Sequence, residues 1–415
     1  MSQLPFFTLN DFDLAGKSVL LRLDINSPID PKTGNILDDA RFRAHRETID
    51  SLSKSKVAIL AHQSRPGKND FVSLKAHASH LSNLLRRRVK FVGGLFDERT
   101  LDEIDASEPG DILMLENTRF FSEEVVLAEE KLEVMEKTNI IKNLAGHADY
   151  FVNDAFAAAH RSNVTLVGFS EAMPNIAGKL MENEITGIER FFAIKEGTRI
   201  GIFGGAKADD SVKIIDKMLN EGKLDKIITG GLVGHIFLAA GGMDLGKKNL
   251  DVLKKEVTGF EKILNDAEKL LEKYRDSILT PVDFIGNEDG KVKHYKIEDF
   301  RKDIPAMDIG VDTIAFYASV IKNSDAIMLN GPMGVFELKE YASGTEEIFS
   351  AVAKSRAYKI AGGGHTLAAL ERLGIGEGDI NHISTGGGAL ISYLAGEPMP
   401  GIESLIISKK KFGGS

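Results

Sequence analysis

Short apolar segments alternate with longer helical patterns along nearly the whole chain, and this alternation constrains the fold more than any other feature. Ten segments are typical of buried strands: 19–25, 57–62, 89–92, 112–115 and 150–153 in the first half, and 199–203, 226–229, 326–329, 358–361 and 382–385 in the second. Strands separated by helices favour parallel sheets. The pattern predicts an α/β fold with two doubly wound, Rossmann-like parallel-sheet domains.

The 415 residues suit two or three domains at about 150 residues each. A helical segment between Gly178 and Lys195 joins the halves without a flexible linker, and we expect it to be a hinge helix. We therefore expect one domain at 1–177 and a second at 178–394, with the tail 395–415 packing back on the first. A long charged helix is expected at about 250–274. No repeat of fixed period is evident, which disfavours solenoids and propellers.

Charge and composition exclude several classes of function. The formal net charge is −9, so nothing draws the whole chain to nucleic acid or anionic membrane, and the basic tail 409–411 is interpreted as a solvated end. The chain has no cysteine, which excludes disulfides, thiolate metal sites and thiol nucleophiles. Without a leader pattern or a long apolar run, the sequence predicts a cytoplasmic protein with no nucleic-acid or membrane partner.

Polar and cationic side chains follow the strands of the first half. Ligands of open α/β sheets bind beyond the carboxyl ends of the strands, so these residues mark a candidate site. They are Arg22, Asp24, Asn26, His62, Arg65, Glu116, Asn117, Arg119, Asn153, Asp154, His160 and Arg161, with Arg41 after the first loop. A single arginine is more often a surface ion pair, but four strand ends in succession favour a site for a small polyanion.

Glycines follow the strands of the second half, and each precedes a predicted helix. They are Gly204, Gly205, Gly230, Gly231, Gly331, 362–364 and 386–388, with Lys207 close to the first pair. Glycine lets a backbone approach a ligand closely, and a helix N-terminus attracts phosphate, so this pattern favours a nucleotide site. The motifs GxxxxGK[ST], GxGxxG, HRD and HExxH are absent, which disfavours P-loop NTPases, dinucleotide dehydrogenases, protein kinases and zincins. Lone histidines such as His235 are more often structural than catalytic.

Eight ordered motifs resemble those of the phosphoglycerate kinase family: RLDINSP, AHQSRP, ENTRF, FVNDAFAAAHR, GGAK, NGPMGVFE, GGGHT and STGGG, from Arg22 to Gly388. The resemblance implies an amino-terminal domain for 3-phosphoglycerate or 1,3-bisphosphoglycerate and a carboxy-terminal domain for ATP or ADP with Mg²⁺. It also implies reversible in-line phosphoryl transfer in glycolysis and gluconeogenesis, with electrostatic stabilisation and closure about a hinge. We expect a monomer or a small homo-oligomer.

The resemblance also implies roles for individual residues. Substrate binding falls to Asp24, Ile25, Asn26, Arg41, His62, Gln63, Ser64, Arg65, Arg119 and Arg161. Nucleotide binding falls to Gly205, Ala206, Lys207, Ser211, Gly231, Asn330, Pro332, Gly334, Val335, Glu337, Gly362, Gly363, Gly364, His365 and Thr366. The catalytic set is Arg41, Lys207, Gly363 and Gly387.

Two departures from the family pattern fall in the nucleotide site. Ser211 stands where the family usually has a lysine, and helix geometry argues against Lys213 as a substitute. His365 replaces the aspartate associated with the metal, so the metal ligands stay open, with Asp209 or Asp210 as candidates. Both changes resemble the archaeal branch of the family.

Two rival functions remain. One is a kinase that forms an acyl phosphate on another small acid. The other is a ligand-binding protein with a decayed site, against which the presence of Arg41, Lys207 and Glu337 argues.

Overall fold

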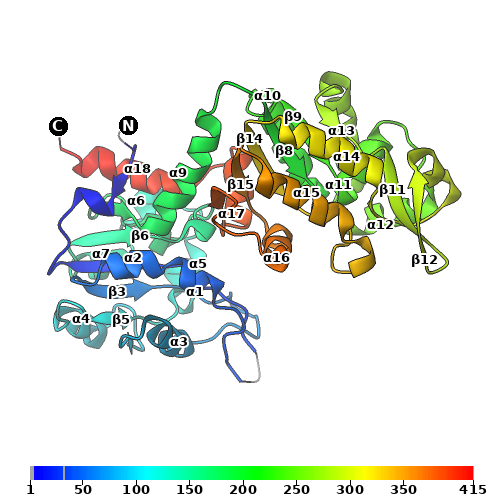
Figure 1. Ribbon diagram of the computed structural model, residues 1–415. Coiled ribbons are helices and arrows are strands. Elements are labelled where there is room, and N and C mark those ends of the chain that lie inside the picture. The colour runs from blue at the N-terminus through cyan, green and yellow to red at the C-terminus, as the bar shows by residue number, and fades with distance from the viewer. Residues whose placement is uncertain (1–3, 31–32, 415) are drawn as a thin grey trace. The chain divides into compact units, whose positions relative to one another are not determined.

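The computed structural model describes residues 4–30 and 33–414, the side chain of Arg301 excepted. The chain divides into two compact units, Met1–Ile185 with Glu397–Ser415, and Thr186–Gly396. The boundary falls within helix α9 (Lys179–Ala193), which lies in the segment expected to join the halves, and not at residue 177 (Figure 1).

The first unit is built on a seven-stranded parallel sheet with strand order β1-β7-β6-β2-β3-β5-β4. Its strands are β1 (Phe7–Thr8), β2 (Ser18–Arg22), β3 (Lys56–Leu60), β4 (Lys90–Phe91), β5 (Ile112–Met114), β6 (Tyr150–Asn153) and β7 (Asn175–Ala177). The five strands predicted here are confirmed within a few residues. The sequence analysis missed β1 and β7, which are too short to show a pattern.

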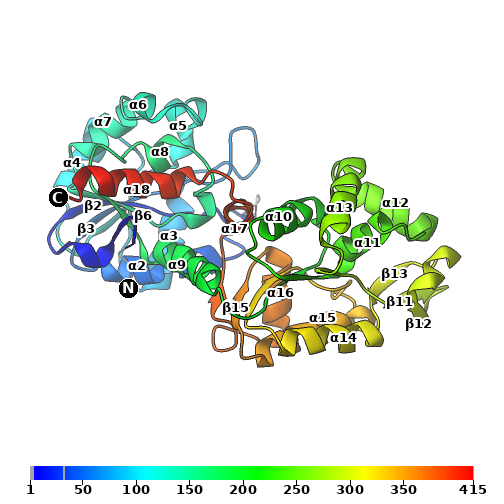
Figure 2. The ribbon, with the colours of Figure 1, turned by 90° about the horizontal axis from the view of Figure 1, so that it is seen from above.

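Both faces of this sheet are buried, because alternate residues of each strand enter different cores. In β2, Leu20 packs in one core and Leu21 in the other. Helices α1 (Ala40–Ala44), α2 (Arg46–Ser51) and α3 (Lys75–Leu85) cover one face, and α4 (Glu98–Asp105), α6 (Leu132–Met135), α7 (Asn139–Ala145) and α8 (Val164–Val167) cover the other, as Figure 2 shows for α2, α3 and α6–α8. The short α5 (Ser122–Val126) follows β5.

The C-terminal helix α18 (Pro400–Phe412) belongs to the first unit. The side chain of Ser408 accepts a 2.8 Å hydrogen bond from the backbone N–H of Asn175 in β7. Lys409 donates to the backbone oxygen of Leu4 at 2.7 Å. The chain therefore returns to its first unit after passing through the second.

The second unit contains a six-stranded parallel sheet with strand order β10-β9-β8-β14-β15-β16. Its strands are β8 (Arg199–Phe203), β9 (Lys226–Thr229), β10 (Ile278–Leu279), β14 (Ala326–Asn330), β15 (Tyr358–Ala361) and β16 (His382–Ile383). Helices α10 (Ala208–Asn220), α11 (Gly231–Ala240) and α13 (Phe260–Tyr274) lie on one side, and α14 (Val311–Lys322) and α15 (Ser343–Lys354) on the other (Figure 2). Helices α16 (Gly364–Leu373) and α17 (Gly388–Leu394) follow the last strands. All five strands predicted here are confirmed.

Short 3₁₀ helices occupy Leu9–Asp11, Thr118–Phe120, Phe156–Ala158, Ile297–Lys302 and Lys339–Tyr341. No helix in the described part of the chain is long and apolar enough to cross a membrane.

A three-stranded antiparallel sheet in the second unit was not predicted. It consists of β11 (Asp283–Glu288), β12 (Lys291–Lys296) and β13 (Ala306–Ile309) in the order β12-β11-β13. Strands β11 and β12 are joined through Asp289 and Gly290, which both have positive φ, at 50° and 80°. An Asp-Gly pair between two strand-like segments is a strong hairpin signal, so the sequence contained the information that we missed.

The single long helix expected at about 250–274 is wrong. Two helices occupy this region, α12 (Gly246–Glu256) and α13. The backbone is extended at Val257, and Gly259 adopts a φ of 70°, a left-handed conformation that interrupts a helix. The amphipathic pattern continued across this break, so periodicity alone did not reveal it.

Candidate functional site

The first unit has a pocket of about 530 Å³ at the carboxyl ends of its strands. Five of the predicted substrate-binding residues line it together: Asn26, Ser64, Arg65, Arg119 and Arg161. The pocket is also lined by Pro66, Lys68, Asp70, Val125 and Asn163, which the sequence analysis did not single out. Three arginines and a lysine around one pocket favour an anionic ligand.

The loop after β3 is held by hydrogen bonds on several sides of Ser64. Its backbone N–H donates to Asn26 Oδ1 at 2.9 Å, and its hydroxyl donates to Asp70 Oδ1 at 2.6 Å. Its backbone oxygen accepts a hydrogen bond from Arg119. Ser64 has a φ of 58°, a conformation that is costly for any residue except glycine, so these contacts maintain a strained backbone.

Gln63 supports this loop from beneath. Its side chain is buried, accepts from the backbone N–H of Ser27 at 3.2 Å and donates to the Ser27 oxygen at 3.1 Å. His77 in α3 lies 3.0 Å from the same amide oxygen. Gln63 therefore ties the loop after β3 to the loop after β2 and does not line the pocket.

His62 is also buried, and its imidazole faces Arg22. Arg22 Nη2 lies 3.0 Å from His62 Nδ1. A guanidinium can only donate, so Nδ1 accepts and the proton resides on Nε2. Burial lowers the pKa of His62 well below its ordinary value and keeps the ring neutral. The Nε2–H group has no hydrogen-bond partner among the described residues, and His62 does not line the arginine pocket.

Arg41 in α1 forms a 2.7 Å ion pair with Asp24. Burial by itself would raise the pKa of Asp24, but the guanidinium groups of Arg41 and Arg22 hold it below the ordinary value, so Asp24 is ionised. Asp24 thus orients Arg41, whose side chain remains 38% exposed. Ile25 is fully buried in the hydrophobic core, so its side chain is not available to a ligand.

The arginines of the pocket act on one another. Burial, assisted by the nearby Arg161 and Arg22, lowers the pKa of Arg119 to about 10. Arg119 therefore remains charged at neutral pH, but its charge is incompletely balanced. An anionic ligand would relieve this repulsion.

The second unit has a pocket of about 440 Å³ bordered by its glycine turns. The predicted residues that line it are Gly205, Ala206, Lys207, Ser211, Asn330, Pro332, Gly363, Gly364, His365, Thr366 and Gly387. Lys207 is exposed and immediately precedes α10. Gly363 precedes α16 with a φ of 94°, where a side chain would be strained. The arrangement offers backbone N–H groups and one mobile cation to a phosphate chain.

Two further predicted glycines are required by close packing. A Cβ atom on Gly231 would lie 2.7 Å from the backbone nitrogen of Gly205, so Gly231 lets α11 approach the turn at Gly205. A Cβ atom on Gly362 would lie 2.0 Å from Leu390 Cδ2. Gly362 does not line this pocket, and its position is explained by the packing of α17.

The departures from the family pattern lie in this pocket. Ser211 lines it and is buried, whereas Lys213 is exposed and does not line it, as the helix geometry predicted. Asp210 lines the pocket and Asp209 does not. His365 is 64% exposed, and its Nδ1 lies 3.8 Å from Glu337 Oε1.

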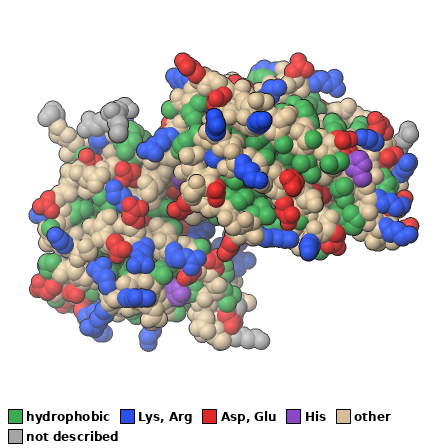
Figure 3. All heavy atoms as spheres, in the orientation of Figure 1, with side chains coloured by type: hydrophobic (Ala, Val, Ile, Leu, Met, Phe, Trp, Pro, Cys, Tyr) green, Lys and Arg blue, Asp and Glu red, His purple; other side chains and the backbone are tan. Residues whose placement is uncertain are grey.

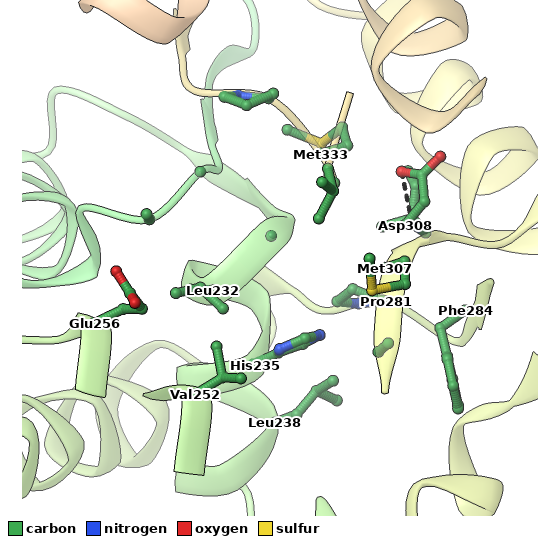
Figure 4. Close-up of a pocket in the computed structure, with 18 of the residues that line it drawn as sticks. Leu232, His235, Leu238, Val252, Glu256, Pro281, Phe284, Met307, Asp308 and Met333 are labelled. Carbon is green, nitrogen blue, oxygen red and sulfur yellow. Dashed lines mark hydrogen bonds between the residues drawn. The ribbon is translucent and has the colours of Figure 1, made fainter. Parts of the chain in front are cut away.

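A second pocket of the same unit, of about 330 Å³, adjoins the first (Figure 4). Four residues border both pockets: Gly205, Ala206, Pro332 and His365. The predicted Gly231, Gly334, Val335 and Glu337 also line it. The rest of its wall is mostly apolar and includes Leu232, Leu238, Val252, Phe284, Phe300 and Met307. Apolar side chains are also visible on the face of this unit shown in Figure 3.

The sequence analysis missed this apolar wall because its residues come from unrelated elements. Leu232 and Leu238 belong to α11, Val252 to α12, Phe284 to β11 and Met307 to β13. Each fits the ordinary hydrophobic pattern of its own element. The antiparallel sheet, which carries two of them, was itself not predicted.

A separate group that could hold a metal ion comprises Asp283, His294 and Asp312. The Asp283 carboxylate already accepts 2.9 Å hydrogen bonds from the backbone N–H groups of Asp312 and Thr313, and it lies 2.5 Å from His294 Nε2. Lys296 forms an ion pair with Asp312. The Asp283 carboxylate therefore caps the N-terminus of α14, and the contacts with His294 and Lys296 connect this helix end to β12. These contacts explain the group without a metal ion.

Comparisons with known proteins agree on one family. The family model described as phosphoglycerate kinase matches residues 9–397. Phosphoglycerate kinase of Thermoplasma acidophilum is 51% identical over 409 residues, which cover 99% of each chain. That of Methanothermus fervidus is 44% identical and covers 98% of each chain.

Solved structures agree as well. The crystal structure of phosphoglycerate kinase from Pyrococcus horikoshii OT3 matches with a TM-score of 0.87 and 40% identity, over 98% of this chain and all of that one (100%). The enzyme from Coxiella burnetii matches with a TM-score of 0.82 and 31% identity, over 97% of this chain and 99% of that one.

Proposed function

This chain belongs to the phosphoglycerate kinase family of glycolytic phosphotransferases, and we propose that it transfers a phosphoryl group reversibly between 1,3-bisphosphoglycerate and ADP, giving 3-phosphoglycerate and ATP. The observation that carries the residue assignment is the contrast between the two units. One has an arginine-lined pocket at its strand ends, and the other has a glycine-bordered pocket beside an apolar one.

We assign phosphoglycerate to the first unit. Arg65, Arg119 and Arg161 supply bidentate donors for phosphate and carboxylate oxygens. The Nε2–H group of His62 is a buried donor without a partner in the described chain, and an anionic oxygen would satisfy it. Asn26 completes the set with its amide.

The nucleotide is assigned to the second unit. The glycine turns and Lys207 would bind the phosphates, Glu337 would accept hydrogen bonds from the ribose hydroxyls, and the apolar pocket would hold the base. Asn330 and Thr366 are already linked to the turns, since the Asn330 backbone oxygen accepts from the N–H of Gly204 at 2.9 Å and Thr366 Oγ1 accepts from the N–H of Gly331 at 2.7 Å.

The donor set fits a nucleotide-bound Mg²⁺ through Asp210, an oxygen-bearing residue that lines the phosphate pocket. His365 fits this role poorly, because Mg²⁺ prefers oxygen ligands and imidazole suits softer metals. When bound, Mg²⁺ would neutralise part of the charge on the phosphates. The ion would therefore rest mainly on nucleotide oxygens and water.

The reaction requires no catalytic base, because the acceptor is a carboxylate that is already ionised at neutral pH, with a pKa of about 4. Catalysis is then positioning and charge stabilisation around the transferring phosphoryl group. Arg41, held by Asp24, and Lys207 would stabilise its equatorial oxygens, together with the N–H groups near Gly363 and Gly387. Because the two ligands are assigned to different units, transfer requires domain closure during turnover and exclusion of water.

The test is a coupled assay of ATP- and Mg²⁺-dependent phosphorylation of 3-phosphoglycerate, run on the wild type and on His365→Asp. We expect robust turnover by the wild type, because the cationic and glycine-bordered pockets are both complete. We expect no turnover by the wild type with acetate or other small acids. Turnover with such an acid would instead support the rival kinase that phosphorylates another acid. Absence of turnover in a wild type that still binds 3-phosphoglycerate and ADP would refute the proposal and support the decayed site, most directly if His365→Asp restored activity.

A further inference from the structure

One polar side chain in the apolar pocket of the second unit is not explained by the roles above. His235 projects from α11 among Leu232, Leu238 and Val252 and toward Pro281 (Figure 4). These four neighbours are apolar, and the other polar side chains that line the pocket are Glu256, Asp283, Asp308, Glu337 and His365. The ring therefore places two nitrogen atoms among the apolar side chains of the pocket wall.

Neither ring nitrogen of His235 has a hydrogen-bond partner among the described residues. The ring is instead oriented by packing, edge to face against Phe300 at 5.4 Å and 83°. Phe300 stacks on Phe284 at 4.2 Å, so the antiparallel sheet fixes this orientation. His235 is half-buried and lines the pocket, so its oriented ring nitrogens are available to a hydrogen-bonding group of a ligand.

The ring is neutral, which narrows the chemistry of that partner. Burial lowers the pKa of His235 to about 4, with no charged neighbour contributing. A neutral imidazole offers one N–H donor and one acceptor nitrogen and adds no charge to the pocket. It suits an uncharged heterocycle and not a phosphate.

We propose that His235 hydrogen-bonds the substituent at position 6 of a purine base. The inference rests on the proposed function, since that function places phosphates at the glycine turns and the ribose at Glu337. The base then enters the apolar pocket with the edge farthest from the ribose leading, and this edge carries position 6.

The tautomer of His235 is not set by any second hydrogen bond. The ring can therefore accept from the amino group of adenine or, in its other tautomer, donate to the oxo group of hypoxanthine. A purine with hydrogen at position 6 offers it neither. His235 accordingly favours the binding of any purine with a hydrogen-bonding 6-substituent and does not distinguish an amino group from an oxo group.

The test measures dissociation constants by titration calorimetry for ADP, inosine diphosphate and purine riboside diphosphate, which lacks the 6-substituent. The proteins are the wild type, His235→Leu, His235→Gln and Val252→Ala. In the wild type we expect purine riboside diphosphate to bind about three- to tenfold more weakly than the other two, as for one net hydrogen bond. His235→Leu abolishes this ratio, whereas His235→Gln retains it, because an amide also offers a donor and an acceptor.

Val252→Ala is the matched control, because Val252 lines the same pocket without a polar atom. This variant should weaken the binding of all three nucleotides by the same factor. Each ratio is measured within one variant, so partial unfolding does not change it. Equal affinities in the wild type, or an unchanged ratio in His235→Leu, would overturn the inference. If phosphorylation of 3-phosphoglycerate fails while the ratio behaves as expected, the proposed function fails and the role of His235 stands.

Discussion

We expect the free energy of unfolding to depend on pH through Asp308, and the size of this effect can be worked out from the structure. This aspartate at the end of β13 is only 5% exposed. Its carboxylate accepts from the backbone N–H groups of Gly344 at 2.6 Å and Ile309 at 2.9 Å. Burial outweighs these two donors, Glu346 adds repulsion, and the pKa of Asp308 rises from 3.8 to about 7.

The shift from 3.8 to about 7 is roughly three pH units, and at 1.36 kcal/mol per unit it amounts to about 4 kcal/mol. Between those two values the folded chain keeps a proton on Asp308 that the unfolded chain releases. Folding therefore binds a proton, and the free energy of unfolding falls as pH rises. The contribution is fully present below the unfolded pKa and is lost as pH rises through about 7.

The perturbation is Asp308→Asn, which keeps an amide oxygen for one backbone donor and removes the titration. Urea unfolding of both proteins, followed by far-UV circular dichroism, yields the free energy of unfolding at pH 5 and pH 8. Relative to the variant, the wild type should lose about 2.5 kcal/mol between these values. Other titrating groups are common to both proteins and cancel. Parallel pH profiles would refute the argument that Asp308 is protonated in the folded state.

Two further predictions concern the second unit. Lys207→Ala should lower kcat about a hundredfold with little change in the KM for nucleotide, since a donor to the transferring phosphoryl group acts mainly in the transition state. Lys213→Ala is the control and should change neither constant, because Lys213 does not line the pocket. A raised KM with a normal kcat in Lys207→Ala would contradict this role. Gly231→Ala should weaken the binding of ADP, because the new Cβ would lie 2.7 Å from the Gly205 nitrogen. The affinity for 3-phosphoglycerate should not change, and calorimetry measures both. Gly222→Ala, with a similar φ of 60° and open space, is the control that should leave ADP affinity intact, and equal ADP affinities in both variants count against the close approach.

The pattern of apolar segments predicted ten of the parallel strands, because buried parallel strands are apolar on both faces and are readily recognised. The residues after those strands could then be assigned to two ligand pockets without any structure. Arg65, Arg119 and Arg161 do line one pocket, because the carboxyl ends of parallel strands lie at one edge of the sheet.

The sequence could not separate residues that line a pocket from those that support it. Gln63 is adjacent to Ser64 in sequence, and Ile25 is adjacent to Asn26. The side chains of Gln63 and Ile25 nevertheless point into the interior, whereas Ser64 and Asn26 line the pocket. The apolar pocket was missed for another reason. Its wall is assembled from α11, α12 and the antiparallel sheet, and only the tertiary fold brings these elements together.

Each unit has a neutral imidazole with at least one ring nitrogen that has no hydrogen-bond partner among the described residues. His62 faces Arg22 in the first unit and His235 lies in the apolar pocket of the second, and burial lowers the pKa of each. A histidine with an ordinary pKa would titrate near neutrality and change the charge around its ligand. Transfer between a carboxylate and a phosphate moves no proton, so a titrating imidazole would bring a pH dependence that the chemistry does not require. Burial therefore suits these two histidines to hydrogen bonding and not to acid–base catalysis, which agrees with a mechanism based on positioning and charge.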